Sequence, residues 1–232
     1  SQCYVNDFDP QNNDGALRYK HVDKNGNMGR KQQAKFDLLI DCRGNGATPK
    51  NSPKYAMPLQ DLRSVRGELF QLYAPQVNLS RPIRLMHPRY QLYIAPKGKG
   101  FYVVGATEIE SDDASPMTVR SAMELLSAAY SVHPGFAEAN IRQHISQCRP
   151  AFSDNQPKIL IQPKLLQVNG LYRHGFLIAP VVLAQVNQLV NHLTKNDLNL
   201  KKVNQATIDE ANFKYSKLLP ICVVQKNNRV TP

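Results

Sequence analysis

The chain has 232 residues, 42% of them apolar, which suffices for one large or two small domains with a hydrophobic core. No segment is expected to span a membrane, and nothing at the start resembles a secretory signal. The net charge of +11 is spread from Arg18 to Arg229 rather than gathered in a stripe, which favours a solvated basic surface or an attraction for anionic ligands over nucleic-acid binding.

The first part of the chain predicts short strands with turn-rich joints. Segments 2–9 and 16–23 read as strands separated by a Gly-containing turn. AKFDLLID at 34–41 is a nearly continuous apolar run, which is typical of a strand buried on both faces. It ends in the glycine turn DCRGNGA, and ligands bind at the carboxyl ends of strands in open α/β sheets.

The middle of the chain predicts an antiparallel sheet, because its segments are rich in β-branched and aromatic residues and are joined by short Pro or Gly turns. The expected strands cover residues 66–75, 83–88, 90–97 and 101–108. A helix over 117–131 follows, with Ser115 and Pro116 as its N-cap and first-turn pair. One face of it carries Val119, Met123, Leu126 and Tyr130.

Extended segments near 141–150 and 158–171 precede a second helix. Proline is favoured at the first helical position, so this helix is expected to begin near Pro180. Its free amides and positive dipole end would then point at the turn that holds Arg173, His174 and Gly175, and would stabilise an anion or an electron-rich carbonyl. An ordinary strand–turn–helix joint is the alternative.

Strand-rich and helical stretches alternate without a regular βαβ rhythm, so the predicted fold class is α+β. The strand at 34–41 and the last helix look like parts of an α/β nucleotide-type sheet, and the middle looks like a separate antiparallel layer. Neither Gly44-x-Gly46 nor the Gly98-x-Gly100 pair completes a G-x-G-x-x-G motif, so no dinucleotide fingerprint is present.

The cysteines and histidines indicate no metal site. Four scattered cysteines form no C-x-x-C pair, which favours a cytoplasmic chain with free thiols over a disulfide framework. The six histidines show no ligand spacing. Among other polar residues, Tyr93, Arg149 and Arg173 stand out, since guanidinium groups bind carboxylates in a fork and a phenol can add a donor. Local sequence leaves open whether these three share a site or are ordinary strand and surface residues.

Four blocks occur in an order that resembles the flavin-dependent amine oxidases of the D-amino-acid oxidase superfamily, and in particular the glycine oxidases of thiamine biosynthesis. The blocks read RPIRLMHPRYQLYIAPKGKGFYVVGATEIES, HPGFAEA, CRPAFSDNQPKI and VNGLYRHGFLIAP, and the resemblance covers about residues 35–195. It implies FAD as cofactor and a small amino acid, typically glycine, as substrate. The amine would be oxidised by hydride transfer to the flavin, with oxygen as final acceptor and hydrogen peroxide as product, and the imine would feed thiazole synthesis.

The resemblance also implies roles for individual residues. Tyr93 and Arg149 match residues that hold the substrate carboxylate, and Arg173 matches a residue beside the flavin whose backbone helps to place the amine. The positions that match the cofactor site, around the dinucleotide and under the flavin pyrimidine edge, are Gly44, Gly46, Gly170, His174, Gly175, Phe176, Leu177 and Ile178.

The family's N-terminal βαβ unit, with its G-x-G-x-x-G and ribose-binding acid, has no counterpart here. The chain is therefore expected to be the C-terminal portion of such an enzyme. Residues 1–65 and 166–200 would belong to the Rossmann-like FAD-binding domain, 66–165 to an antiparallel substrate domain and 201–232 to a tail. Whether FAD stays bound and whether the protein forms a homo-oligomer are left open, and a non-catalytic fragment that cannot retain FAD is the alternative.

Overall fold

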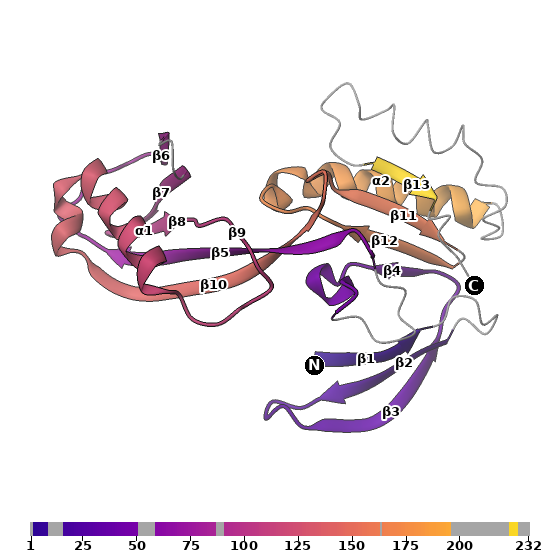
Figure 1. The fold of residues 1–232 in the computed structure, drawn as a ribbon. Helices are drawn as coiled ribbons and strands as arrows, with labels where there is room; N and C mark the ends of the chain where they lie inside the picture. The colour runs from indigo at the N-terminus through magenta and orange to yellow at the C-terminus, as the bar shows by residue number, and fades with distance from the viewer. Residues whose placement is uncertain are drawn as a thin grey trace. The chain divides into compact units, whose positions relative to one another are not determined.

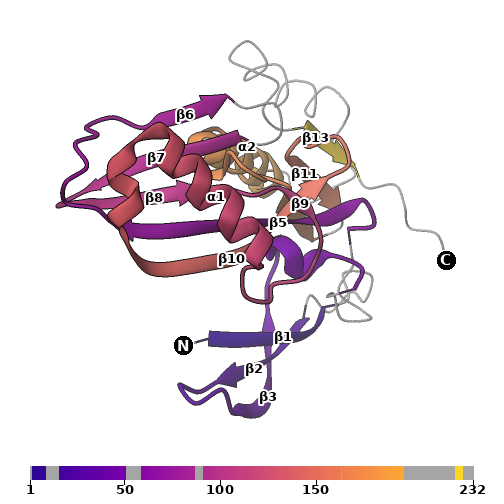
Figure 2. The same cartoon turned by 60° about the vertical axis from the view of Figure 1, so that its left-hand side comes forward.

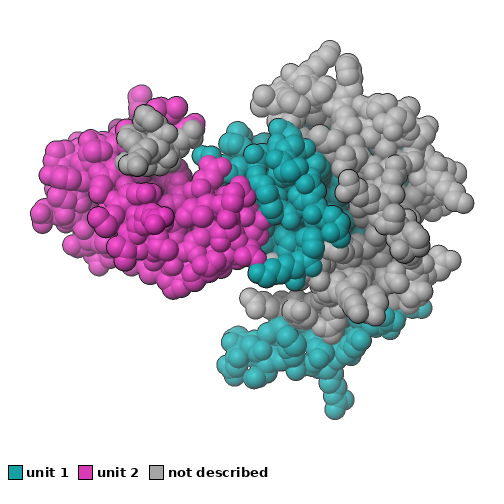
Figure 3. Space-filling view, viewed as in Figure 1, with its two compact units in different colours: residues 1–63, 150–232 teal, residues 64–149 magenta. Residues whose placement is uncertain are grey.

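A computed structural model describes residues 2–8, 16–50, 59–86, 91–162, 164–195 and 223–226. The chain divides into two compact units (Figure 3). Unit 1 comprises residues 1–63 and 150–232, and unit 2 comprises residues 64–149. The division falls within two long strands, so that unit 2 is inserted into unit 1 in sequence.

Unit 2 is built on a six-stranded sheet in the order β10-β5-β8-β7-β6, with β9 also paired to β5. The strand bounds are β5 Leu62–Tyr73, β6 Ile83–Met86, β7 Gln91–Gly98, β8 Phe101–Gly105, β9 Ile109–Glu110 and β10 Asn140–Phe152. The pairs β5·β8, β7·β8 and β6·β7 are antiparallel, which confirms the antiparallel sheet predicted for the middle of the chain.

One face of this sheet is covered by α1, Val119–Val132, and by the short 3-10 helix η2, Pro134–Glu138 (Figures 1 and 2). Alternate strand residues point toward α1, because successive side chains of a strand lie on opposite faces. Phe70, Leu72, Ile94 and Val104 of the strands form the core of unit 2 with Leu125, Ala128, Ala129 and Phe136. Each large apolar side chain buried here contributes about 1.5–3 kcal/mol of transfer free energy.

The predicted helix exists, but two details of the prediction were wrong. Thr118, not Ser115, is the N-cap, and its Oγ1 accepts a hydrogen bond from the Ser121 amide at 3.2 Å. The expected apolar face is largely exposed, since Val119, Met123 and Tyr130 are 76%, 64% and 55% exposed in the structure. The buried face instead carries Ser121, Leu125, Ala128 and Ala129, whose mostly small side chains let the helix approach the sheet closely.

The described residues of unit 1 form two sheets. In the first, β1 Gln2–Phe8, β2 Ala16–Val22 and β3 Met28–Lys35 are antiparallel. The second has the order β13-β11-β12-β4, with β4 Leu39–Asp41, β11 Lys158–Gln162, β12 Leu165–Asn169 and β13 Val223–Lys226. Strands β12 and β4 run parallel, as do β11 and β13, whereas β11 and β12 are antiparallel. The mixed sheets and few helices agree with the predicted α+β class.

The prediction of a single buried strand at 34–41 was wrong. Its first two residues end β3 in one sheet, and residues 39–41 form β4 in the other. The chain has to leave the first sheet between them, at 36–38, before it can pair with β12. Ile40 is 42% exposed, so β4 is not buried on both faces either.

Helix α2, Gly175–Lys195, packs along β11 and β12 (Figure 1). Its side chains Ile178, Val182, Val186 and Leu189 share a core with strand residues of that sheet. The expectation that no segment could span a membrane fails for α2 by length and composition, because residues 175–193 have a mean hydropathy of 1.3. A core helix of a globular protein meets the same two criteria, and this helix has one face in a core.

The predicted start of the second helix at Pro180 was also wrong, because α2 begins five residues earlier. The amides of Leu177 and Ile178 both donate to the His174 carbonyl, at 2.9 and 3.0 Å, and so close the first turn before the proline is reached. Pro180 then lies inside the helix, where its missing N–H removes one bond, to the Phe176 carbonyl.

Candidate functional site

A first group of candidate residues lies in unit 1, at the edge of the four-stranded sheet where β4 and β12 end. Because β4 and β12 run parallel, with Asp41 opposite Gln167, the turns that follow them leave the sheet at the same edge. The Asn169 Nδ2 atom donates to the Gly44 carbonyl at 3.0 Å and ties the two turns together. The 3-10 helix η1, Gly44–Ala47, follows β4, and α2 begins five residues after Gly170. The cofactor-binding residues predicted from the sequence thus gather at one sheet edge.

Arg43 is committed to this edge rather than free for a ligand. It bonds the Asp41 carboxylate through Nε at 2.9 Å and Nη2 at 2.8 Å, and its Nη1 donates to the Gly46 carbonyl at 3.2 Å. Burial raises the pKa of Asp41, but the bonds and charge of Arg43, with a smaller contribution from Gln167, outweigh it and hold the pKa below its usual range. Asp41 therefore stays ionised at neutral pH and fixes Arg43 and η1.

The two glycines that open the turns adopt backbone conformations that other residues rarely adopt. Gly44 has φ +57° and Gly170 has φ +77°. A Cβ atom at Gly170 would also overlap the Phe152 ring, which lies in a small core with Leu62. Gly46 and Gly175 have no such backbone constraint, and the nearest atom to a Cβ at Gly175 would be 3.7 Å away.

Replacing Gly170 by alanine is expected to lower the free energy of unfolding by about 2–4 kcal/mol, since overpacking against Phe152 adds to left-handed backbone strain. Gly26→Ala is the matched control, because Gly26 has φ +83° and nothing within 4 Å of an added Cβ. The control should cost only about 1–2 kcal/mol. Urea unfolding curves measure both losses. Equal losses of unfolding free energy in the two variants would mean that the Phe152 ring moves aside with no loss of stability.

The start of α2 presents unpaired backbone donors beside exposed side chains. The first amides of a helix have no acceptor within the helix, and the dipole makes that end positive. The side chains of His174, Phe176 and Leu177 are exposed there, and Phe176 is fully exposed. The Ile178 side chain is different, because it is buried in the core of unit 1. The Ile178 amide already donates to the His174 carbonyl at 3.0 Å, so Ile178 helps to close the first turn of α2 and offers a ligand neither its side chain nor its amide.

A second group of candidate residues lies in unit 2, on the sheet face opposite α1. Tyr93 of β7 pairs with Gly105 of β8, which pairs with Leu69 of β5, so these three residues share one face. Gly67 lies two residues before Leu69 and shares that face too. The Tyr93 hydroxyl lies over Gly105, 3.2 Å from the position of an added Cβ. Tyr93 is 38% exposed.

Arg149 of β10 occupies the same face. A Cβ atom at Gly67 would overlap three atoms of the Arg149 guanidinium group, so this group lies directly on the Gly67 backbone. Its Nη1 atom donates to the Thr107 carbonyl at 3.4 Å. The structure therefore brings Tyr93 and Arg149 onto one open face, while Arg173, the third residue of the prediction, belongs to unit 1.

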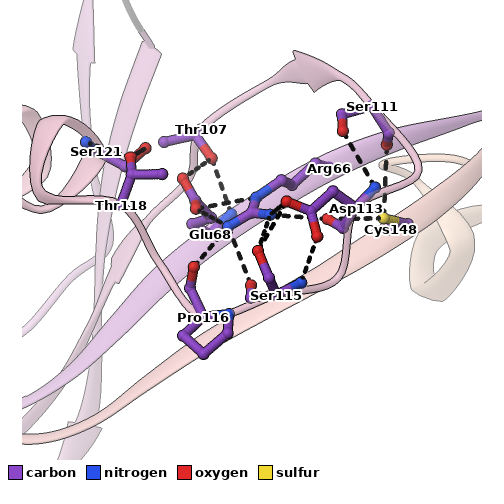
Figure 4. Close-up of polar contacts among 10 residues, drawn as sticks. All are labelled: Arg66, Glu68, Thr107, Ser111, Asp113, Ser115, Pro116, Thr118, Ser121 and Cys148. Atoms are coloured by element: carbon purple, nitrogen blue, oxygen red, sulfur yellow. Dashed lines mark hydrogen bonds and ion pairs between the residues drawn. The ribbon is translucent and has the colours of Figure 1, made fainter.

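A buried polar cluster stands on the other face of β5, beside the start of α1 (Figure 4). Arg66 and Glu68 are 3% and 0% exposed, and Arg66 bonds the Glu68 carboxylate through Nε at 3.0 Å and Nη2 at 2.6 Å. Arg66 also donates to the Asp113, Ser115 and Pro116 carbonyls at 2.8–3.0 Å. The Thr107 Oγ1 atom donates to Glu68 Oε2 at 3.0 Å. Thr107 thus links the two faces of the sheet. Its side chain contacts the buried cluster, and its backbone carbonyl accepts the bond from Arg149.

Sequence reasoning missed Gly67, Gly105 and Thr107. A signal existed for Gly67, because an isolated glycine within the strand pattern RGELFQLY indicates a close approach of another group to the backbone. For Thr107 nothing in the local sequence indicates the role. Within the described part of the chain, no group of three or more His, Cys, Asp or Glu side chains could hold a metal ion.

Comparisons with known proteins show the family to which the chain is similar. A family model described as FAD dependent oxidoreductase matches residues 2–186. The chain is 47% identical over 150 residues to a putative thiamine biosynthesis oxidoreductase ThiO of Rhizobium etli, covering 65% of this chain and 43% of that protein. It is 31% identical over 119 residues to a glycine oxidase of Bacillus licheniformis, covering 50% and 31%.

The fold matches solved structures as well. The crystal structure of glycine oxidase from Geobacillus kaustophilus superposes with a TM-score of 0.66 at 21% identity, over 82% of this chain and 48% of that one. The crystal structure of L-proline dehydrogenase from P. horikoshii gives a TM-score of 0.61 at 16% identity, over 81% and 49%. At such identities the likeness shows the fold alone. The chain spans less than half the length of the curated relatives that it matches.

Proposed function

Because the chain belongs to the family of FAD dependent oxidoreductases, we propose that it forms the substrate-binding and flavin-facing parts of an enzyme that oxidises glycine or another small amino acid. Unit 2 would bind the amino acid, and unit 1 would be the remaining part of the FAD-binding domain. The names of the relatives, a thiamine biosynthesis oxidoreductase and a glycine oxidase, support glycine as substrate and thiazole synthesis as the use of the product.

The observation that carries the proposal is the shared sheet face of Tyr93 and Arg149 in unit 2. A guanidinium group offers a planar fork of N–H donors that matches a carboxylate, and a phenol adds one more donor. These two side chains would bind the carboxylate of the amino acid and leave its α-carbon and amine free to react.

The residues at the sheet edge where β4 and β12 end have the chemistry that a bound flavin would need. The α2 start supplies backbone donors and the positive end of a helix dipole, which suit an electron-rich carbonyl edge. Gly44 and Gly170 would hold the cofactor through their backbone turns, and Arg173 to Leu177 would lie beside it. Bound FAD would supply the two-electron acceptor for the hydride from the substrate α-carbon.

The overall reaction balances without an acid–base dyad from this chain. The amine loses a hydride and a proton to become an imine, and molecular oxygen takes up the two electrons and two protons as hydrogen peroxide. The chain's own residues would bind the carboxylate, orient the α-carbon and exclude competing ligands. The imine would then be available for thiazole formation.

The proposal is tested by adding FAD to the purified protein and recording its visible absorbance, followed by peroxide release with glycine. A retained flavin band with glycine-dependent peroxide is the expected result. Glycinamide, which lacks the carboxylate, should release peroxide much more slowly at equal concentration. Flavin-bound protein that releases no peroxide with glycine would contradict the proposal, and a protein that stays colourless after FAD addition would support the non-catalytic alternative.

A further inference from the structure

Two glycines shape the open face of the unit 2 sheet. Gly67 and Gly105 are diagonal neighbours on β5 and β8, because Gly105 pairs with Leu69. Diagonal neighbours across an antiparallel pair lie about 7–8 Å apart. The Arg149 guanidinium lies over the first glycine and the Tyr93 hydroxyl over the second. That spacing fits one carboxylate bonded from both sides, since each hydrogen bond spans about 2.7–3.0 Å.

The place of the guanidinium depends on Gly67 more than on any polar partner. The hydrogen bond from its Nη1 atom to the Thr107 carbonyl is long, at 3.4 Å. By contrast, a Cβ atom at Gly67 would overlap the guanidinium carbon and both of its terminal nitrogens. Any side chain at residue 67 would therefore lift the group off the sheet.

We propose that Gly67 is a positioning residue, which sets the height of the Arg149 guanidinium above the sheet and thereby the affinity for the substrate carboxylate. This inference rests on the proposed function. Gly67 itself touches no substrate in this scheme and acts through Arg149.

The two glycines differ in what a methyl group would disturb. At Gly67 the overlapping atoms are the far end of a flexible side chain, which can swing away at little cost to folding. At Gly105 the added Cβ would lie 2.8 Å from the Leu69 Cβ, an atom that is fixed to its backbone. Gly67→Ala should therefore alter binding with little loss of stability, a separation that a merely structural glycine would not show.

The test is a double-mutant cycle on the FAD-loaded enzyme with Gly67→Ala, Arg149→Ala and the double variant. Acetate is the probe, and its dissociation constant is measured by titration calorimetry in each protein. Gly67→Ala alone is expected to raise that constant about tenfold, in line with the loss of a charge-assisted bond. In the Arg149→Ala background the same change should have almost no effect, because no guanidinium remains to be displaced.

Steady-state kinetics with glycine should show the same weakening of substrate binding in Gly67→Ala. Gly67→Ala should raise the apparent KM for glycine about tenfold, and thermal unfolding should shift by no more than a few degrees. If Arg149→Ala weakens acetate binding and Gly67→Ala does not, the positioning role is overturned and the proposed function stands. If Arg149→Ala leaves acetate binding unchanged, both are overturned. An equal effect of Gly67→Ala with and without Arg149 would likewise end the positioning role.

Discussion

Glu68→Ala is expected to lower the free energy of unfolding by about 3–5 kcal/mol, the range observed when one partner of a buried ion pair is removed. Glu68 is fully buried, and the variant would leave the Arg66 guanidinium without its principal counter-charge. Asp113 also pairs with Arg66, at 2.9 Å, but its side chain is 58% exposed and its interaction is screened by solvent.

The loss should extend beyond the pair itself. Arg66 holds the segment before α1 through the Asp113, Ser115 and Pro116 carbonyls, and Glu68 contacts Thr107 from the sheet side. Moving Arg66 to find a new partner would therefore loosen the start of α1. Urea unfolding measures the effect, and Glu124→Ala, at an exposed position of α1, is the control, expected within about 0.5 kcal/mol of the native protein. A loss at Glu68 as small as that of the control would contradict the prediction.

The pH dependence of stability gives an independent view of Glu68. Burial raises the pKa of this carboxyl group, but hydrogen bonds from Ser121, Arg66 and Thr107 outweigh it, so the folded pKa lies below 4.5, the unperturbed value. A lowered pKa contributes stability that is complete above the unfolded value and is lost as pH falls through the folded value. Native protein should therefore lose stability below about pH 4.5, and Glu68→Gln should lose less over the same interval.

Much of the fold follows from local sequence. The strands β5 to β8 were predictable because they are rich in β-branched and aromatic residues and are joined by short Pro or Gly turns. β6 pairs with β7 and β7 with β8, which are neighbours in sequence, whereas β5 pairs with β8 across the two strands between them. β4 was not predictable, because its length and sheet depend on β12, which lies more than 100 residues away in the chain. The start of α2 was misplaced because a proline can lie inside a helix whose first turn is closed by the His174 carbonyl.

The α1 errors have tertiary causes too. Ser115 looks like an N-cap in sequence, but its backbone carbonyl and hydroxyl are drawn into the Arg66 and Asp113 contacts. Thr118 is then the next residue able to cap. The large apolar residues suggested the buried face, yet the sheet accepts a face of small residues around Leu125. Which face is buried was decided by the packing partner and not by apolar size.

The candidate site, too, could be predicted from the sequence only in part. Tyr93 and Arg149 were singled out by residue type and by family resemblance, and the structure shows that they share a sheet face. The glycines beneath them could not be given that role from sequence, because a glycine's effect depends on what lies above it. Gly67 matters through a side chain of β10, some 80 residues later in sequence.

Arg149→Ala is expected to raise the apparent KM for glycine about tenfold or more in the FAD-loaded enzyme. A hydrogen bond to a charged group contributes about 1.5–3 kcal/mol, and every 1.4 kcal/mol corresponds to a factor of ten. The turnover number should fall less than kcat/KM, because the carboxylate is bound in both the ground state and the transition state. Steady-state peroxide release over a range of glycine concentrations measures both parameters.

Two further variants separate charge from geometry. Arg149→Lys keeps the positive charge but loses the planar fork, so it should recover only part of the affinity. Arg142→Ala removes an exposed cation from the same strand, one whose guanidinium lies 5.0 Å from the Tyr73 ring centroid, and should leave KM within about twofold of the native value. If all three variants bound glycine equally well, long-range attraction by the +11 net charge would suffice to explain binding, and Arg149 would have no place in the site. A loss confined to Arg149 would instead show that one guanidinium, held flat on a bare stretch of backbone, recognises the carboxylate.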